Sequence, residues 1–594
     1  MPNLIQRVLQ SVSKPLLLPL DDFRPRLAFR VGVTGHRDLN AETCQALRPR
    51  VRARLEQIKH LAEQAAAKSR GAYHKHAPAI LRAVSPLAEG ADRIFAEEAL
   101  ELGYELECPL PFHRQEYRND FTDEVSKRQF DDLLARAKGV VFELDGTRKD
   151  APAAYALVGQ LVVDQCDMLL AIWDGNDVKG TGGTAQVVQQ ATRRRIPVVW
   201  LHPDAREPDV ILPPDESEHG GRDNKGEIDE RIKEAVWRHL LPPKGLDPTR
   251  PLGPIEGLPL GPIEGRLARM LQPWVWRLFE RALTVGVRRT RGPAGAPSKL
   301  SGFSAEYARW DGLATRFAGL YRVAFLLNYV LGFSAVFLAI IGNAAEGRWL
   351  WPAVCESILI WIVITLMTFL QTRRWHMRMA DCRYLAERFR IFCYTYPLGL
   401  PALKPHPPAL YLHAKFLGPL EWHMRAIVRL TPMPTAKVTE GYLLRHSEAM
   451  RKWVRGQIHY HDRNAAKLET IERRLIRLCW WFIWLSLLAA LSAWMFHSAV
   501  EQRHLERLLL FFTAGLPAAS AAAHAISTQG EFRRLVELSE STARLLRSCR
   551  KDIDRQGPST AAYLRRQTED LAQVLLDEVA QWQILYRKPA PPPG

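Results

Sequence analysis

Cysteine is sparse in this sequence, with eight scattered over 594 residues and no Cys-x-x-Cys pair. Zinc ribbons and dithiol redox sites use such pairs, so neither is predicted. His-x-His occurs at His74/His76 and at His459/His461. The second pair lies in a helical pattern, where residues two apart point about 200° from each other and cannot share a metal. We therefore predict no metal site.

A cleavable signal sequence is also lacking. Residues 1–26 hold a short apolar stretch after Lys14, but prolines interrupt it and no small-residue cleavage site follows. We predict that this amino-terminal extension stays in the cytoplasm.

Acidic residues are outnumbered, 64 against 81 lysines and arginines, which gives a formal net charge of +17. Such a charge suits nucleic acid or an anionic membrane surface. The arginines cluster beside apolar segments, which favours the membrane and argues against a nucleic-acid partner. These arginines are Arg322, Arg373, Arg374, Arg378, Arg473, Arg474, Arg477, Arg533 and Arg534.

Four apolar segments occupy the carboxyl-terminal half, and their only acidic or basic side chains are Glu356 and His524. Each is long enough to cross a hydrocarbon core of about 30 Å, and tryptophans flank several ends. The alternative, buried helices of a soluble protein, does not explain the tryptophans and arginines at those ends. We predict four transmembrane helices in two hairpins: 323–342 with 349–370, and 478–496 with 508–527.

The loops between these segments predict an orientation. Both hairpin tips are short, whereas residues 371–477 form a long, arginine-rich segment, so the positive-inside rule places that segment and both termini in the cytoplasm. This pattern predicts a multi-pass membrane protein. Four spans carry few polar groups, so a conducting path requires association of copies, with a tetramer favoured. The candidate pore residues are Asn328, Glu356, Pro517 and His524.

The amino-terminal part has a different pattern, in which short apolar strands alternate with helical segments. Strands are expected within 26–35, 79–86, 105–111, 140–146, 166–175 and 197–203, the last of the set. This alternation is typical of a parallel α/β sheet with a Rossmann-like, doubly wound fold.

Three loops of this α/β unit follow strand ends, where such sheets bind ligands. Their glycines permit tight turns, and the third loop runs into a helix amino terminus, which favours phosphate. Plain turn glycines are the alternative. The candidate ligand-binding residues are Gly32, Thr34, Gly35, His36 and Arg37; Glu89, Gly90, Asp92 and Arg93; and Trp173, Asp174, Gly175, Gly180, Gly182, Gly183 and Thr184.

The runs VGVTGHRD, SPLAEGADR, PLPF and DMLLAIWDG with KGTGGT together resemble the SLOG superfamily, which includes DprA- and LOG-type proteins. The resemblance spans about 27–205 and implies a Rossmann-like domain that binds nucleotides or their derivatives. LOG-type hydrolases carry P-G-G-x-G-T-x-x-E, and Val187 stands where that glutamate would be. We therefore expect the domain to sense a ligand and not to hydrolyse it. Glu89 is the one acidic residue that could still act in a hydrolase.

The carboxyl-terminal half resembles SLATT modules, on the run WVRGQIHYHDRNA followed by a helix and an apolar hairpin. The first hairpin looks like a more divergent copy. The resemblance implies an effector of bacterial antiviral defence, located in the bacterial inner membrane, that forms pores when a nucleotide signal arrives. The expected units are 1–26, the SLOG-like domain 27–205, a linker with amphipathic helices 206–300, the SLATT-like hairpins 301–395 and 451–550, the cytoplasmic connector 396–450 between them, and a cytoplasmic tail 551–594.

The sequence thus predicts a ligand-gated membrane effector, without a cofactor, whose partner is a nucleotide second messenger. An ADP-ribose derivative from a TIR partner and a cyclic nucleotide from a nucleotidyltransferase both suit the glycine loops. A membrane-tethered nucleotide or NAD-derivative hydrolase and an ungated scaffold or transporter are the alternatives.

Overall fold

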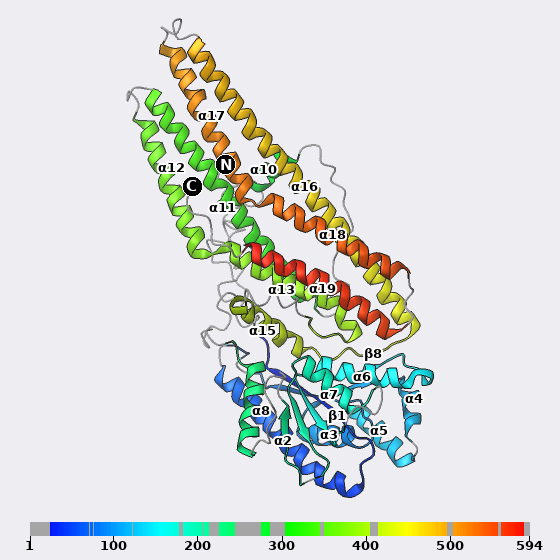
Figure 1. The fold of residues 1–594 in the computed structure, drawn as a ribbon. Helices are drawn as coiled ribbons and strands as arrows, with labels where there is room; N and C mark the ends of the chain where they lie inside the picture. The colour runs from blue at the N-terminus through cyan, green and yellow to red at the C-terminus, as the bar shows by residue number, and fades with distance from the viewer. Residues whose placement is uncertain are drawn as a thin grey trace, which may run out of the picture.

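The computed structural model describes residues 24–69, 72–74, 77–121, 123–176, 182–204, 206–212, 225–243, 275–284, 303–344, 350–403, 414–495, 503–555 and 560–586. An α/β domain lies at one end, a body of helices follows, and two helical hairpins project from the other end (Figure 1). The expected linker contains the motif LGPIEG twice, at 252–257 and 260–265, and both copies lie outside the described residues.

The α/β domain is built on one eight-stranded sheet with the order β7-β6-β5-β1-β2-β3-β4-β8. All neighbours are parallel except β7, which pairs antiparallel with β6. The central strand, β1, places Val31 beside Ala83 of β2 and Met168 of β5. The strands are β1 (Ala28–Gly35), β2 (Ile80–Val84), β3 (Glu105–Leu110), β4 (Val141–Glu143), β5 (Met168–Ile172), β6 (Val198–Leu201), β7 (Val210–Leu212) and β8 (Ala436–Lys437).

Helices cover both faces of this sheet (Figure 1). Gly32 and Gly35 show the two sides, because a Cβ at Gly32 would meet Val162 of α6 and a Cβ at Gly35 would meet Ala91 of α3. The parallel α/β domain expected from the sequence is therefore present. Its helices are α2 (Ala41–Lys68), α3 (Ala91–Glu101), α4 (Arg114–Tyr117), η2 (Arg118–Asp120), α5 (Glu124–Arg136), η3 (Arg148–Asp150), α6 (Ala151–Gln165), α7 (Thr184–Arg193) and α8 (Lys225–Leu240).

The sheet extends beyond the strand expected to be its last, within 197–203. β7 adds an antiparallel edge, and β8 adds the other edge from residues that follow two of the long apolar helices in sequence. α8 buries Ile228, Ile232 and Val236 in the same core as α2. The α/β domain is thus completed by residues that the sequence alone places in a linker and a connector.

The carboxyl-terminal half is helical. α11 pairs with α12 and α16 pairs with α17, which forms the two hairpins, and α13, α15, α18 and α19 lie between the hairpins and the sheet (Figure 1). The helices are α10 (Val275–Leu283), α11 (Ser304–Ala344), α12 (Trp351–Arg373), α13 (Trp375–Thr395), η4 (Tyr396–Leu398), α15 (Ala414–Leu430), α16 (Glu440–Met495), α17 (Arg503–Gln529), α18 (Phe532–Arg555) and α19 (Ala561–Tyr586).

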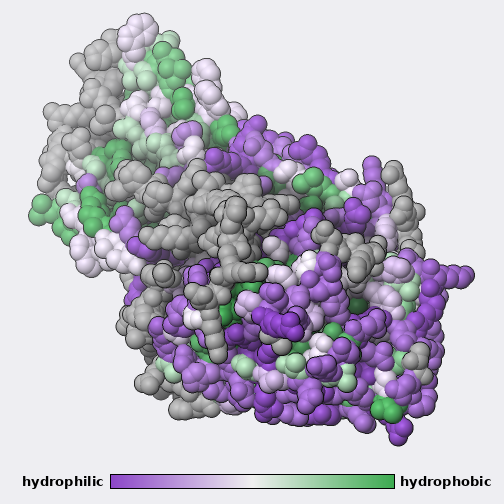
Figure 2. All heavy atoms as spheres, turned by 60° about the horizontal axis from the view of Figure 1, so that its bottom comes forward, coloured by the Kyte–Doolittle hydropathy of each residue, from purple (hydrophilic) through white to green (hydrophobic). Residues whose placement is uncertain are grey.

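In the part of the chain that the structure describes, three helical segments are long and apolar enough to cross a membrane: Ser304–Gly342, Trp351–Leu398 and Glu440–Met495. The fourth predicted span coincides with α17, which is a helix packed against α16 but is not among these three. Large apolar side chains are exposed along the hairpins, among them Trp361, Trp480 and Trp494. Hydrophobic residues gather at that end of the molecule, whereas the α/β end is largely hydrophilic (Figure 2). An apolar surface of this kind needs lipid or another protein against it.

Candidate functional site

A cavity of about 360 Å³ lies at the carboxyl edge of the sheet, where β1, β2 and β5 end side by side. Loops from all three strands reach it, together with α6 and the amino terminus of α7. Parallel sheets bind ligands at this edge because the strand order reverses there and the loops diverge. In this sheet the strands β1 to β4 follow one another to one side, and the connection after β4 crosses to β5 on the other side of β1.

Ten of the sixteen candidate ligand-binding residues line the cavity, and they come from all three predicted loops. The ten are Thr34, Gly35, His36, Arg37, Asp92, Trp173, Asp174, Gly182, Gly183 and Thr184. The sequence argument that three strand ends bring these loops together therefore agrees with their positions.

Five other candidates lie near the cavity but do not line it: Gly32, Gly90, Gly175, Glu89 and Arg93. Gly32 packs on Val162 and Cys166, and Gly175 packs on Trp200. Gly90 has a φ of +73° and lies so close to the backbone of Arg37 that a Cβ would come within 2.5 Å of its carbonyl oxygen. Gly90 thus lets α3 approach the first loop. Gly180 falls outside the described residues.

Glu89 and Arg93 belong to a separate polar contact behind the second loop. The Ser126 hydroxyl donates to Glu89 Oε1, and Arg93 Nη1 donates to the Ser126 hydroxyl at 2.7 Å. Arg93 also donates to Gln129 at 3.0 Å. These two side chains hold α5 against α3, so the acidic residue that enters the cavity is Asp92 and not Glu89.

The amino terminus of α7 opens into the cavity. Gly183 is the N-cap residue and no side chain among the described residues caps the helix, so the first amides of α7 retain donor capacity. Gly182 has a φ of +90°, and its N–H donates to Gln186 Oε1 at 2.6 Å. Because Gly182 adopts this left-handed conformation, the loop turns directly into the first turn of α7. Helix amino termini that follow such a glycine loop commonly bind anions.

Arg37 supplies a positive charge at the same cavity. Its guanidinium lies over the Tyr155 ring, 4.4 Å from the centroid, and 3.8 Å from Asp120 Oδ2. Burial opposes its charge, but Tyr117, Tyr155 and Asp92 raise the pKa of Arg37 above the ordinary value. The side chain remains 42% exposed, so it is charged, oriented by an aromatic ring and accessible to a ligand.

Two carboxyl groups of the cavity differ in ionisation. Asp92 is 6% exposed, and burial raises its pKa to about 7 against the opposing effect of Arg37. Desolvation acts on Asp174 in the same direction, but hydrogen bonds from Asn176 and the nearby His36 hold the pKa of Asp174 below its usual range. His36 Nε2 lies 3.1 Å from both the backbone nitrogen and Oδ1 of Asp174. At pH 7 Asp174 is charged, whereas Asp92 is about half protonated.

The inner wall of the cavity is apolar and includes residues that the sequence argument did not find. Val158, Gly159 and Val162 come from α6, and Tyr117 comes from α4. α6 was not predicted, because its sequence APAAYALVGQLVVDQ is apolar around most of the helix and gives no amphipathic period. The cavity therefore combines an apolar wall, a stacking ring, an arginine and a helix amino terminus, which suits a nucleoside joined to phosphate.

The predicted pore residues lie on three helices: Asn328 on α11, Glu356 on α12, and Pro517 and His524 on α17. Asn328 Oδ1 is buried without a hydrogen-bond partner among the described residues. Pro517 and His524 are exposed in the single chain, and Glu356 is half-buried. Within the described residues, no group of three or more His, Cys, Asp or Glu side chains is placed to hold a metal ion.

No protein-family model matches this sequence, and no curated protein is significantly similar to it.

Proposed function

We propose that this chain is a bacterial membrane effector whose α/β domain binds a nucleotide second messenger and thereby opens a pore formed by its helical hairpins. The observation that carries the proposal is the cavity at the carboxyl edge of the sheet. Arg37 and the uncapped amino terminus of α7 can bind phosphate, and Tyr155 with the valines of α6 can pack against a nucleoside. The resemblance of the three loops to SLOG domains supports the same ligand class, either an ADP-ribose derivative or a cyclic nucleotide.

α6 supports a mechanical link between ligand and membrane region. Tyr155 to Val162 line the cavity, while the next turn of the same helix holds the helical body. Asp164 Oδ2 accepts from Arg565 of α19 at 2.6 Å, and Gln165 Nε2 donates to the Gly399 carbonyl at 2.9 Å. A ligand that shifts α6 therefore moves two groups that are already bonded to the helical region. Packed helices of this kind transmit small shifts because they deform little.

The hairpins supply the membrane half of the proposal. Their exposed apolar side chains fit lipid, and arginines at the ends nearest the helical body fit a cytoplasmic leaflet. In this arrangement α17 is the fourth span, both termini are cytoplasmic, and four copies assemble around a shared path. Glu356 and Asn328 are polar groups within spans and would border that path, because such groups are costly against lipid.

A nucleotide hydrolase is the second candidate, and Asp92 is the observation that favours it. A buried carboxyl group with a pKa of about 7 in a ligand cavity can exchange a proton at neutral pH, as a general acid or base must. Val187 still replaces the glutamate of LOG-type hydrolases and lines the cavity, so the effector remains the better supported function.

Binding and turnover measured together distinguish the two. The full chain in lipid nanodiscs is titrated calorimetrically with ADP-ribose, cyclic ADP-ribose and cyclic dinucleotides, and each ligand is then examined by chromatography. The effector binds one of these nucleotides and returns it unchanged, and Gly183→Glu abolishes binding because a carboxylate enters the phosphate position. Binding of no nucleotide, or equal binding by Gly183→Glu, contradicts the proposal. A product that disappears in Asp92→Asn establishes the hydrolase.

A further inference from the structure

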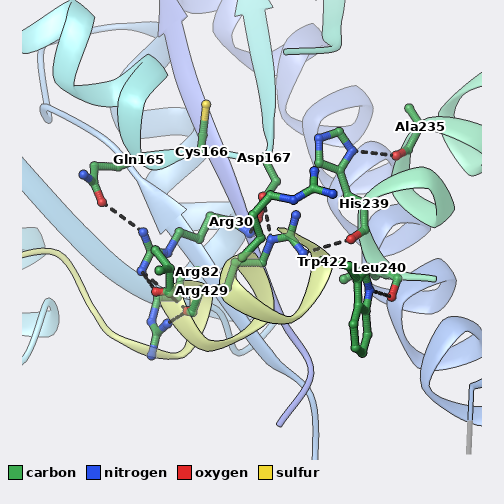
Figure 3. A network of polar contacts seen from close by, with 12 residues as sticks. Arg30, Arg82, Gln165, Cys166, Asp167, Ala235, His239, Leu240, Trp422 and Arg429 are labelled. Carbon is green, nitrogen blue, oxygen red and sulfur yellow. Dashed lines mark hydrogen bonds and ion pairs between the residues drawn. The ribbon is translucent and has the colours of Figure 1, made fainter. Parts of the chain in front are cut away.

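A second and larger cavity, of about 840 Å³, lies at the opposite, amino edge of the sheet. It is enclosed by the starts of β1, β5 and β6, by α8, and by α15 and the residues after η4. This is where the helical body meets the α/β domain, and Figure 3 shows the polar contacts of this junction. Cavities of several hundred Å³ are the size of small-molecule sites.

Arginines from the sheet fix the carboxyl terminus of α15 at this junction. Arg30 Nη2 donates to the Val428 carbonyl at 3.1 Å, and Arg82 Nη2 donates to the Leu430 carbonyl at 3.0 Å. The last carbonyls of a helix lack partners within the helix and carry partial negative charge, so guanidinium groups stabilise them. Of these two arginines, Arg30 lines the cavity, and Arg82 holds the end of α15 from outside the lining.

The carboxylates of the cavity are already engaged. Asp167 Oδ1 accepts from Arg429 Nε at 2.7 Å and Oδ2 accepts from the Arg30 backbone nitrogen at 3.1 Å (Figure 3). Asp164 bonds to Arg565 at 2.6 Å and also contacts Arg194. These carboxylates hold the junction together and have little capacity left for further cations.

Positive charge remains in excess. Seven arginines and four carboxylates line the cavity among the described residues. Burial lowers the pKa of His239 to about 4, so His239 is neutral at pH 7. Arg30 Nε and Arg429 Nη2 are buried and have no hydrogen-bond partner among the described residues. Buried guanidinium nitrogens without acceptors are costly, and a negative charge in the cavity that Arg30 and Arg429 line would offset part of that cost.

Arg425 completes this set from α15. Its Nε donates to the Glu421 carbonyl at 3.4 Å, which is a long contact, and its side chain lines the cavity one turn before Arg429. Burial, and then the charge of Arg429, lower the pKa of Arg425. A group in such surroundings gains from a nearby negative charge.

We propose that this amino-edge cavity is a second ligand site, which binds a small molecule carrying a phosphoryl group with at least two negative charges. Guanidinium groups present paired donors that match phosphate oxygens, which is why arginines gather at such sites. Ile196, Ile211 and Leu212 form an aliphatic part of the lining for the rest of the ligand.

The ligand is a freely diffusing molecule and not a lipid headgroup. α13 has 21 residues, which span about 30 Å between the end of α12 and the residues after η4 that line the cavity. A lipid at the membrane end of α12 is therefore too distant. A bound phosphate would bridge β1 and α15, and so would tighten the attachment of the helical body to the sheet.

Pyrophosphate is the probe that tests this site, because it has the charge without the nucleoside. The full chain carrying Gly183→Glu is placed in phosphatidylcholine nanodiscs and titrated calorimetrically, so that binding at the carboxyl-edge cavity is removed. We expect one pyrophosphate per chain, at least a tenfold loss of affinity when Arg425→Gln is added, and partial recovery with Arg425→Lys. Arg533→Gln is the matched control, because Arg533 is exposed on α18 and its loss should leave the affinity unchanged.

Melting temperatures without pyrophosphate show that each variant is folded before its affinity is compared. The inference is overturned if the Gly183→Glu protein does not bind pyrophosphate, or if Arg425→Gln and Arg533→Gln weaken binding equally, which indicates general attraction to positive charge. It is also overturned if nanodiscs containing phosphatidylglycerol abolish the binding, since a lipid headgroup then occupies the site. Nucleotide binding by the wild-type chain is measured separately, so failure here leaves the carboxyl-edge site untouched.

Discussion

Replacement of Arg37 by glutamine isolates the contribution of one guanidinium to ligand binding. Arg37 lines the carboxyl-edge cavity, lies over Tyr155 and is 3.8 Å from Asp120. Glutamine removes the charge but keeps a polar side chain that fits the same space. Any loss of affinity then reports the interaction between Arg37 and the ligand phosphate.

The size of the loss follows from the charge of both partners. A hydrogen bond to a charged group contributes about 1.5–3 kcal/mol, which corresponds to roughly a ten- to 150-fold loss of affinity. The folded state should lose little, because the contact between Arg37 and the buried carboxylate of Asp120 is long, at 3.8 Å, and Asp120 keeps Arg148 and Tyr155 as partners. Affinity should thus fall far more than stability.

Arg148 provides the matched control for this experiment. It contacts the same carboxylate, Asp120, and is 39% exposed, but it does not line the cavity. Calorimetry with the tightest-binding nucleotide of the panel should show a ten- to 150-fold loss for Arg37→Gln. Arg148→Gln should bind like the wild type. If both variants bind like the wild type, or if both lose affinity together, Arg37 does not contact the phosphate and the assignment is refuted.

Three further predictions concern the same site and the membrane helices. The pKa of Asp92 is raised to about 7, above its unfolded value, so protonation of Asp92 favours both folding and the binding of an anionic ligand. The free energy of unfolding and the ligand affinity should therefore fall as pH rises toward and through 7. Asp92→Asn should remove this pH dependence in calorimetry at pH 5.5 to 8.5. Gly182→Ala forces a φ of +90° on alanine and brings its Cβ within 3.0 Å of the α6 backbone. Gly139→Ala is the control, because Gly139 has a φ of +85° and no neighbour within 4 Å of the added Cβ. Both variants should lose about 1 kcal/mol of stability, but only Gly182→Ala should also lose ligand affinity. Cysteines at Ala344 and Ala499 should react with a periplasmic thiol reagent and a cysteine at Gln371 should not, and the reverse pattern would invert the proposed topology.

The strands of the α/β domain were predictable because a buried parallel strand is a short, continuous apolar run between turns. Six of the eight strands fall within segments identified in that way. β8 was not predictable, since Ala436 and Lys437 form a strand only because β4 offers them a free edge. β7 has only three residues and follows a proline-containing loop. Pairing between distant segments determines both.

The residues of the candidate site that come from the three loops were predictable, and those that come from α6 were not. Strand ends of a parallel sheet meet at one edge, so His36, Asp92 and Asp174 were placed together without knowledge of the structure. Tyr155 and the valines of α6 were missed, because an apolar helix packed on a sheet gives no sign of which turn faces a cavity. The amino-edge cavity had no sequence signal, since its arginines come from segments far apart in the chain.

Ion flux from liposomes tests most directly the central claim, that a nucleotide at the carboxyl edge of the sheet opens a path through the hairpins. Vesicles containing the full chain and a trapped ion-sensitive dye are exposed to the nucleotide that binds it, applied on the side of the α/β domain. The account predicts flux that depends on nucleotide concentration with the affinity measured by calorimetry, and no flux from vesicles containing Gly183→Glu. Flux that is the same with and without nucleotide, or equal in wild type and Gly183→Glu, would contradict it.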